Sequence, residues 1–272
     1  MFKKRGSGRR YVTGMTSLAP ASPRSIVALS GFRFRLWPIL LAAALMQVLL
    51  ELGRIPAREI YRAGAPLWDG YVSVFLLLAI AFQALLGLAA IFAMRRLLPA
   101  VDPHLRWPPG ASYAGVAALI GVGMGLVMLI ADYWPALAAQ TPPDMSYSKA
   151  PLDSAGYLLG MITTGLAEET IFRGLLVGML VVLVPGRLRI GSLDLPVAAY
   201  LVALMFGLAH WKSFTVDPFY QAMAQQIYAF AWGLVYVWLM ERSRSLLAPI
   251  VAHGLGNFTE VGIVIALNIL WA

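Results

Sequence analysis

Three charged side chains lie close together in a strongly apolar stretch of the chain. Glu168, Glu169 and Arg173 all fall within residues 167–174. Insertion scales give a charge at the bilayer centre a cost of roughly 2.5–3.5 kcal/mol, so three unpaired charges would cost about 8–10 kcal/mol. That cost rivals the net stability of a typical folded domain, about 5–15 kcal/mol. We therefore expect these charges to be paired or to face a polar cavity, and they are functional candidates.

Two histidines and an asparagine add polar groups to later apolar segments. His210 ends one segment, and His253 and Asn257 lie one helical turn apart in the last one. At 1.5 Å per residue, Glu168, His210 and His253 all fall within roughly 10 Å of the bilayer midplane. Three helices are thus expected to bring acid–base groups to a similar depth.

A carboxylate and an imidazole that meet in a dry cavity can activate water. Glu168 could take a proton from water and make it nucleophilic. His210 could hold that water or share its proton. His253 and Asn257 could donate hydrogen bonds to the oxyanion that forms when a carbonyl is attacked. The products of such a reaction are those of amide hydrolysis.

Structural roles stay open for several of these residues. Glu169 and Arg173 are four residues apart, so they could form an ion pair that only fixes helix packing. A lone histidine in a membrane is often a hydrogen-bond partner between helices. Glu260 shares the stripe of His253 and Asn257, and it either supports the site or lies at a helix interface.

Other features are expected to serve packing. His104, in a loop, is expected to be an ordinary loop residue. A polar and aromatic stripe either packs between helices or lines a peptide groove; it consists of Gln221, Gln225, Tyr228 and Trp232. Small residues allow helices to approach closely; those expected to do so are Gly121, Gly123, Gly125, Gly174 and Gly178.

The composition predicts an all-α membrane protein. Of 272 residues, 60% are hydrophobic and 12% are charged, whereas soluble domains have about 45–50% and about 25%. There is no cysteine, which excludes disulfides and thiolate metal sites. We expect a polytopic bundle of about seven helices, or eight if a long segment breaks at its glycines. The expected spans are 35–52, 71–94, 112–131, 154–183, 196–212, 219–240 and 246–271.

The charge distribution argues for a membrane and against nucleic acid. The net charge is +8, but eight of the 21 basic residues precede residue 36, ahead of the first apolar run. Basic loops mark the cytoplasmic side, so the N-terminus is expected inside a bacterial cytoplasmic membrane. The loops 95–111, 184–195 and 241–245 follow this rule, whereas Arg54, Arg58 and Arg62 break it in the first outside loop.

Three parts of the chain are distinguished. Residues 1–34 form a basic cytoplasmic tail, and either Met1 or Met15 is the true start. Residues 35–149 hold membrane helices without recognisable motifs. Residues 150–272 are expected to form the catalytic membrane core.

The candidate residues resemble the motifs of a known family. The patterns Glu168-Glu169-x-x-x-Arg173, Phe206-x-x-x-His210 and His253-x-x-x-Asn257 are similar, in order, to the three motifs of the CPBP family. That family comprises the type II CAAX prenyl proteases and bacteriocin-processing ("Abi") membrane proteins. Each motif alone is weak, but three in order on separate spans form a specific signal. The resemblance covers about residues 150–260.

The resemblance implies a role for each matching residue. Glu168 corresponds to the glutamate that activates water, His210 to its histidine partner and Glu169 to an accessory carboxylate. Arg173 corresponds to the arginine that closes the first motif, with a structural role. His253 and Asn257 correspond to the pair that stabilises the oxyanion.

The metal content is left open by the residues. The chain has no HExxH zinc motif, but Glu168, His210 and His253 could make an open three-ligand zinc site. We favour a mechanism without a cofactor, in agreement with the glutamate mechanism that the resemblance implies, and keep zinc as the alternative.

These observations predict an integral-membrane endopeptidase that cuts a peptide bond at or within the bilayer. The expected partner is a peptide or membrane-protein substrate, prenylated if it is of the CAAX type. One alternative is a non-catalytic immunity or scaffold protein. The other is a transporter or proton relay, which would also place charges at the midplane but should show internal repeats.

Overall fold

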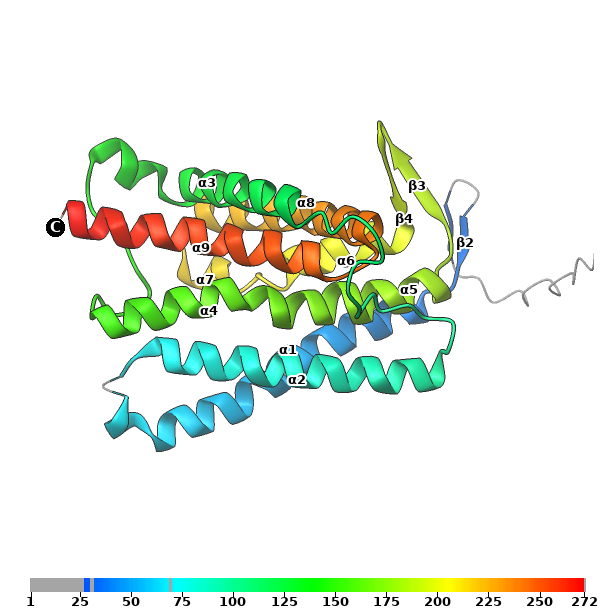
Figure 1. Cartoon of the computed structure of the whole chain (residues 1–272), viewed down its shortest axis with the longest axis horizontal. Helices are drawn as coiled ribbons and strands as arrows, with labels where there is room; N and C mark the ends of the chain where they lie inside the picture. Colours follow the sequence, from blue (N-terminus) through cyan, green and yellow to red (C-terminus); the bar gives the residue numbers. More distant parts are fainter. Residues whose placement is uncertain (1–26, 30–31, 69, 272) are drawn as a thin grey trace, which may run out of the picture.

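The computed structural model describes residues 27–29, 32–68 and 70–271, which form a bundle of long helices lying roughly side by side (Figure 1). Five segments in this part of the chain are long and apolar enough to cross a membrane. They are α1 (Trp37–Ala63), α2 (Val72–Leu97), α3 (Ala114–Ala139), the segment Val197–Val216 and α9 (Leu247–Leu270). The protein is therefore an integral-membrane helical bundle, and the predicted fold class is confirmed.

The fourth expected span forms one continuous helical rod. It consists of α4 (Pro151–Glu169), a π-helix η2 (Thr170–Val177) and α5 (Gly178–Leu183). The backbone stays helical at both junctions, with φ −62° and ψ −45° at Thr170 and φ −53° and ψ −47° at Gly178. Since α9 is also one helix, neither long segment breaks at its glycines.

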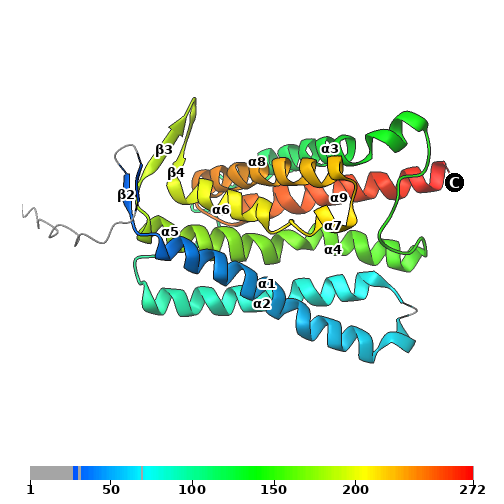
Figure 2. The same cartoon turned by 180° about the vertical axis from the view of Figure 1, so that it is seen from behind.

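The fifth span is short and bent, whereas the sixth is long. Figure 2 shows α6 (Val197–Leu208) followed by a turn and the single-turn helix α7 (Ser213–Val216). The chain then enters α8 (Phe219–Ser243). His210 lies in the turn where α6 ends, so the bend presents it inside the bundle.

The first span is longer than expected, which corrects the predicted loop. Arg54, Arg58 and Arg62 lie within α1, which runs through Pro56 to Ala63. Arg54 pairs with Glu51 at 3.2 Å one turn earlier, so local charge pairing extends the helix beyond its apolar part. The basic residues that break the inside rule are therefore helical rather than in a loop.

A second boundary correction concerns α3. The loop expected to begin at residue 132 begins after Ala139, because α3 continues for two more turns. Asp132 is therefore a helical residue.

Glycines set the distance between α3, α4 and α9. A Cβ atom placed at Gly121 or Gly125 of α3 would lie 2.5 Å from a carbonyl oxygen of α9, that of Ala252 or Gly256. A Cβ at Gly165 of α4 would lie 2.8 Å from the Ile250 carbonyl oxygen. The expected close approach is confirmed at these α3 positions but not at Gly123, where a Cβ would meet nothing within 4 Å.

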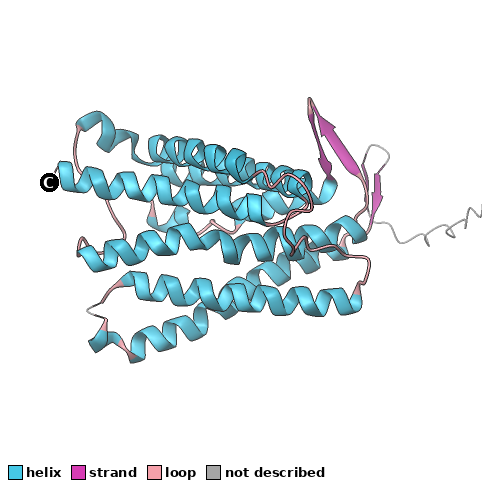
Figure 3. Cartoon of the chain, viewed as in Figure 1, coloured by secondary structure: helices cyan, strands magenta, loops and turns pink. Residues whose placement is uncertain are grey.

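Two antiparallel hairpins lie at the end of the bundle opposite the C-terminus (Figure 3). The first pairs β1 (Val27–Leu29) with β2 (Phe32–Phe34). The second pairs β3 (Arg187–Ile190) with β4 (Leu193–Pro196) through a turn in which Gly191 has a φ of 61°. The second hairpin occupies a loop that the charge pattern assigns to the cytoplasm, outside the spans.

Candidate active site

Glu169 is the best connected of the candidate side chains. Its side chain is fully buried, and one oxygen, Oε1, lies 3.0 Å from Arg173 Nη1 and 2.8 Å from His253 Nδ1. The expected Glu169–Arg173 pair is thus present, and it also holds a histidine from another helix. The carboxylate joins α4, η2 and α9 through one atom.

Arg173 is enclosed by aromatic rings. Its guanidinium carbon lies 4.5 Å from the Phe206 ring centre, 4.9 Å from that of Tyr236 and 5.7 Å from that of Phe172. Cation–π contacts of this kind strengthen when water is excluded. Together with Glu169, the rings allow a fully buried charge to be accommodated.

The π-helix explains how Arg173 reaches this position. All eight residues of η2 are buried, so this turn runs through the middle of the bundle. A π-turn adds a residue to the helical turn and shifts the faces that follow it, and such turns are frequent at functional sites.

His253 is held from two sides. Its ring stacks on Tyr236, with centres 5.1 Å apart and planes at 9°. Because Nδ1 contacts a carboxylate, this nitrogen is the donor, and Nε2 is directed elsewhere. Nε2 lies 3.8 Å from Glu168 Oε2.

His210 is held by its own helix. Its Nδ1 lies 2.9 Å from the carbonyl oxygen of Phe206. A carbonyl can only accept, so Nδ1 carries the hydrogen and Nε2 of the neutral ring has a free lone pair. His210 can therefore accept a proton or a hydrogen bond through Nε2.

Most of the candidates line one cavity of about 270 Å³, which we call the central cavity. Walls come from α3, α4, α6, α8 and α9. The predicted residues that line it are Glu168, His210, His253, Asn257 and Glu260. Glu169 and Arg173 are not among the lining residues; Glu169 contacts Nδ1 of His253, and Arg173 contacts Glu169.

The aromatic stripe of α8 also contributes to this wall. Gln225, Tyr228 and Trp232 line the central cavity, whereas Gln221 lines a different hollow near the α3–α4 loop. The groove-wall interpretation thus fits three of the four positions.

Sequence reasoning missed two residues near the site. Asp132 of α3 accepts a hydrogen bond from the Tyr228 hydroxyl at 2.9 Å, whereas the apolar pattern predicts a loop from residue 132. Tyr236, which stacks on His253, continues the α8 stripe by one further turn. Extending the third predicted helix past residue 131 would have included Asp132. Continuing the α8 stripe by one turn would have included Tyr236.

The candidate zinc ligands line the same cavity without forming a tight cluster. Glu168 Oε2 lies 3.8 Å from His253 Nε2, and Nδ1 of His253 contacts Glu169. Within the described residues, no three His, Asp or Glu side chains converge as metal ligands. Zinc stays the alternative to the mechanism without a cofactor, and we assign no reaction step to a metal.

Comparison with known proteins gives one match. Residues 151–259 match the family model described as type II CAAX prenyl endopeptidase Rce1-like. The matched region begins with α4 and ends within α9, and it contains all three motifs. Neither the curated proteins nor the solved structures contain a match to this chain.

Proposed function

We propose that the central cavity hydrolyses a peptide bond with water activated by Glu168, because residues 151–259 match the type II CAAX prenyl endopeptidase Rce1-like family model. At family level the protein is a CAAX-protease-like membrane endopeptidase, a hydrolase that acts on a peptide substrate within the membrane. The convergence of Glu168, His210, His253 and Asn257 on one cavity supports the finer assignment of roles.

The first step is attack by water on the peptide carbonyl. Glu168 takes a proton from the water, while Nε2 of His210 accepts a hydrogen bond that orients it. The new carbon–oxygen bond turns the carbonyl oxygen into an oxyanion. The Asn257 amide and Nε2–H of protonated His253 donate hydrogen bonds to that oxyanion.

The second step breaks the carbon–nitrogen bond. The proton on Glu168 passes to the leaving amine, so Glu168 is returned to its carboxylate form and one water has been consumed. Glu169 keeps His253 oriented throughout, because its Oε1 accepts a hydrogen bond from Nδ1 at 2.8 Å. In this mechanism Glu169 is a positioning residue and touches neither water nor substrate.

The test compares matched glutamate variants of the purified, reconstituted protein. Glu168→Gln should lower peptide cleavage by roughly 10²–10⁴-fold, the usual contribution of a general base. Glu59→Gln is the control, because Glu59 is an exposed residue of α1 whose one ion pair among the described residues is with Arg62. Equal cleavage by wild type and Glu168→Gln would refute the assignment.

The same assay addresses substrate and metal. Prenylated and unprenylated peptides of one sequence are compared, and we expect a prenylated CAAX peptide to be cut faster. A strong chelator should leave cleavage unchanged under the glutamate mechanism. Loss of activity on chelation, with recovery on adding zinc, would instead support zinc dependence.

A further inference from the structure

A second cavity, of about 560 Å³, lies at the hairpin end of the bundle. The α2–α3 loop, the β3–β4 hairpin and the end of α8 line it. Four arginines contribute to the lining, and we call this hollow the arginine cavity; the four are Arg106, Arg187, Arg242 and Arg244. It shares no lining residue with the central cavity.

Two of the arginines are held by carboxylates. Arg106 Nη2 lies 2.7 Å from Asp102 Oδ2. Arg187 binds both oxygens of Glu241, at 2.9 and 3.0 Å, and its Nε lies 3.1 Å from Asp194. The three carboxylates that line the cavity are therefore already occupied.

The other two arginines have no acidic partner within the described residues. Arg242 lies over the Trp238 ring, with its guanidinium carbon 5.7 Å from the ring centre. Arg244 ends α8 and leaves its guanidinium without an ion pair. With four arginines and three carboxylates, the lining of the cavity has a net positive charge.

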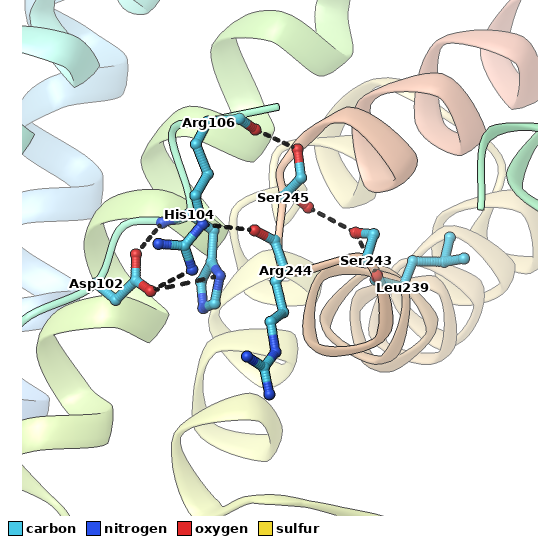
Figure 4. Close-up of polar contacts among 7 residues, drawn as sticks. All are labelled: Asp102, His104, Arg106, Leu239, Ser243, Arg244 and Ser245. Carbon is cyan, nitrogen blue, oxygen red and sulfur yellow. Dashed lines mark hydrogen bonds and ion pairs between the residues drawn. The ribbon is translucent and has the colours of Figure 1, made fainter. Parts of the chain in front are cut away.

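Arg244 is set in place by a network between two loops (Figure 4). Its carbonyl accepts a hydrogen bond from Arg106 Nε at 3.1 Å. The Ser245 hydroxyl donates to the Arg106 carbonyl at 2.6 Å, and the Leu246 amide donates to the His104 carbonyl at 3.1 Å. In Figure 4 the Arg244 side chain points away from Asp102 and Arg106.

Both loops contain strained backbone. Arg244 has a φ of 52° and His104 a φ of 54°, a region that non-glycine residues enter only where the surroundings hold them. Nδ1 of His104 is buried, makes no hydrogen bond in the described structure and lies 3.9 Å from Asp102 Oδ2. The left-handed residues thus hold both loops in fixed positions around one polar hollow.

We propose that the arginine cavity binds a phosphate group, supplied by the headgroup of an anionic phospholipid, on Arg242 and Arg244. Arginine matches phosphate through paired N–H donors. The site lies at the end that the loop charges assign to the cytoplasmic leaflet, where anionic lipids attract basic pockets. Exposed Trp107 and Ile190 flank this end, as interfacial apolar side chains do.

The experiment measures ligand-induced shifts in Tm of the full-length protein in detergent micelles. The ligands are short-chain phosphatidylglycerol, short-chain phosphatidylcholine, inorganic phosphate and a polyglutamate peptide. The variant Arg242→Gln/Arg244→Gln is compared with Arg95→Gln/Arg96→Gln. The control pair lies at the last turn of α2 and removes the same charge at the same end, outside the cavity.

We expect phosphatidylglycerol to raise Tm by several degrees in wild type and in the control pair, and to raise it far less in Arg242→Gln/Arg244→Gln. Phosphatidylcholine should have little effect. If inorganic phosphate alone produces the variant-sensitive shift, the phosphate site stands and its source is free phosphate. Equal shifts in both variants, or a shift with polyglutamate only, would overturn the proposal.

A second variant distinguishes loss of lipid binding from loss of folding. Arg244→Gly removes the guanidinium while suiting the left-handed backbone at that position. It should unfold at or above the wild-type Tm without ligand and still lose most of the phosphatidylglycerol shift. A full shift in this folded variant, together with a full shift in Arg242→Gln, would refute binding at these two arginines. Cleavage activity has no part in this measurement, so it is independent of the proposed function.

Discussion

At the scale of single residues, the centre of this protein depends on one carboxylate oxygen. Oε1 of Glu169 contacts both Arg173 and His253, although Glu168 lines the central cavity. Two adjacent glutamates therefore have different environments, because neighbouring helical residues point roughly 100° apart. Glu168 is therefore placed to react with a substrate, whereas Glu169 holds His253 in position.

We predict that Glu169→Gln is strongly destabilising. It leaves Arg173 buried without its carboxylate, and removing one partner of a buried pair costs about 3–5 kcal/mol. The free energy of unfolding, measured by denaturant titration in mixed micelles, should fall by about this amount. Glu168→Gln should change it much less, because that side chain faces a cavity. Similar values for the two variants would contradict the different environments of the two glutamates.

Tyr228→Phe tests the contact with Asp132. Removing the hydroxyl takes one hydrogen-bond donor away from a buried carboxyl group, which costs about 1–3 kcal/mol. Tyr200→Phe is the control, since its hydroxyl contacts the Leu188 carbonyl in an exposed position, and its effect should stay within about 0.5 kcal/mol. Thermal unfolding of both variants in one detergent checks the difference. If the Tyr228→Phe protein were as stable as the control, the hydrogen bond to Asp132 would not stabilise the site.

At the scale of elements, close helix packing brings the polar residues together. Glycines let α3 and α4 approach the backbone of α9, and that approach brings Glu169 within reach of His253. In lipid, such small-residue contacts replace the hydrophobic drive that packs helices in water. The bend after α6 then adds His210 from a fourth direction.

Gly121→Ala and Gly123→Ala form a matched pair two residues apart on α3. The methyl group at position 121 would press on the Ala252 carbonyl, at a cost of about 1–3 kcal/mol. The one at position 123 meets open space, so alanine there should be neutral or stabilise the helix by up to about 1 kcal/mol. Tm values of the two variants should therefore move in opposite directions from wild type, or at least differ clearly. Equal Tm values would argue against close α3–α9 contact.

At the scale of the whole molecule, the two polar cavities lie at different positions along the length of the bundle. The central cavity lies among the helices, whereas the arginine cavity lies at the hairpin end. The α3–α4 loop lies at the opposite end, next to the C-terminus (Figure 1). The two ends should therefore face opposite sides of the membrane.

The absence of native cysteine makes this arrangement directly measurable. Ser192→Cys, in the β3–β4 turn, and Thr141→Cys, after α3, each introduce a single thiol at an exposed position. With basic loops inside, a membrane-impermeant maleimide should label Thr141→Cys in intact cells and Ser192→Cys only after lysis. The reverse pattern would invert the proposed orientation.

The sequence by itself determined the fold class, the family resemblance and the main members of the central cavity. Long apolar runs require helices in lipid, and charges within them must meet a cavity or a partner; both arguments are local to the chain. It did not determine how far α1 and α3 extend, because charge pairing and packing prolonged them beyond their apolar parts.

Only the tertiary structure decided which glutamate is buried, that Tyr236 stacks on His253, and that four distant arginines surround one hollow. Each of these depends on how helices are rotated and how closely they approach. Such rotations are set by contacts between residues far apart in the sequence. The helical repeat predicts which residues share one face of a helix. It does not predict which other helix packs against that face.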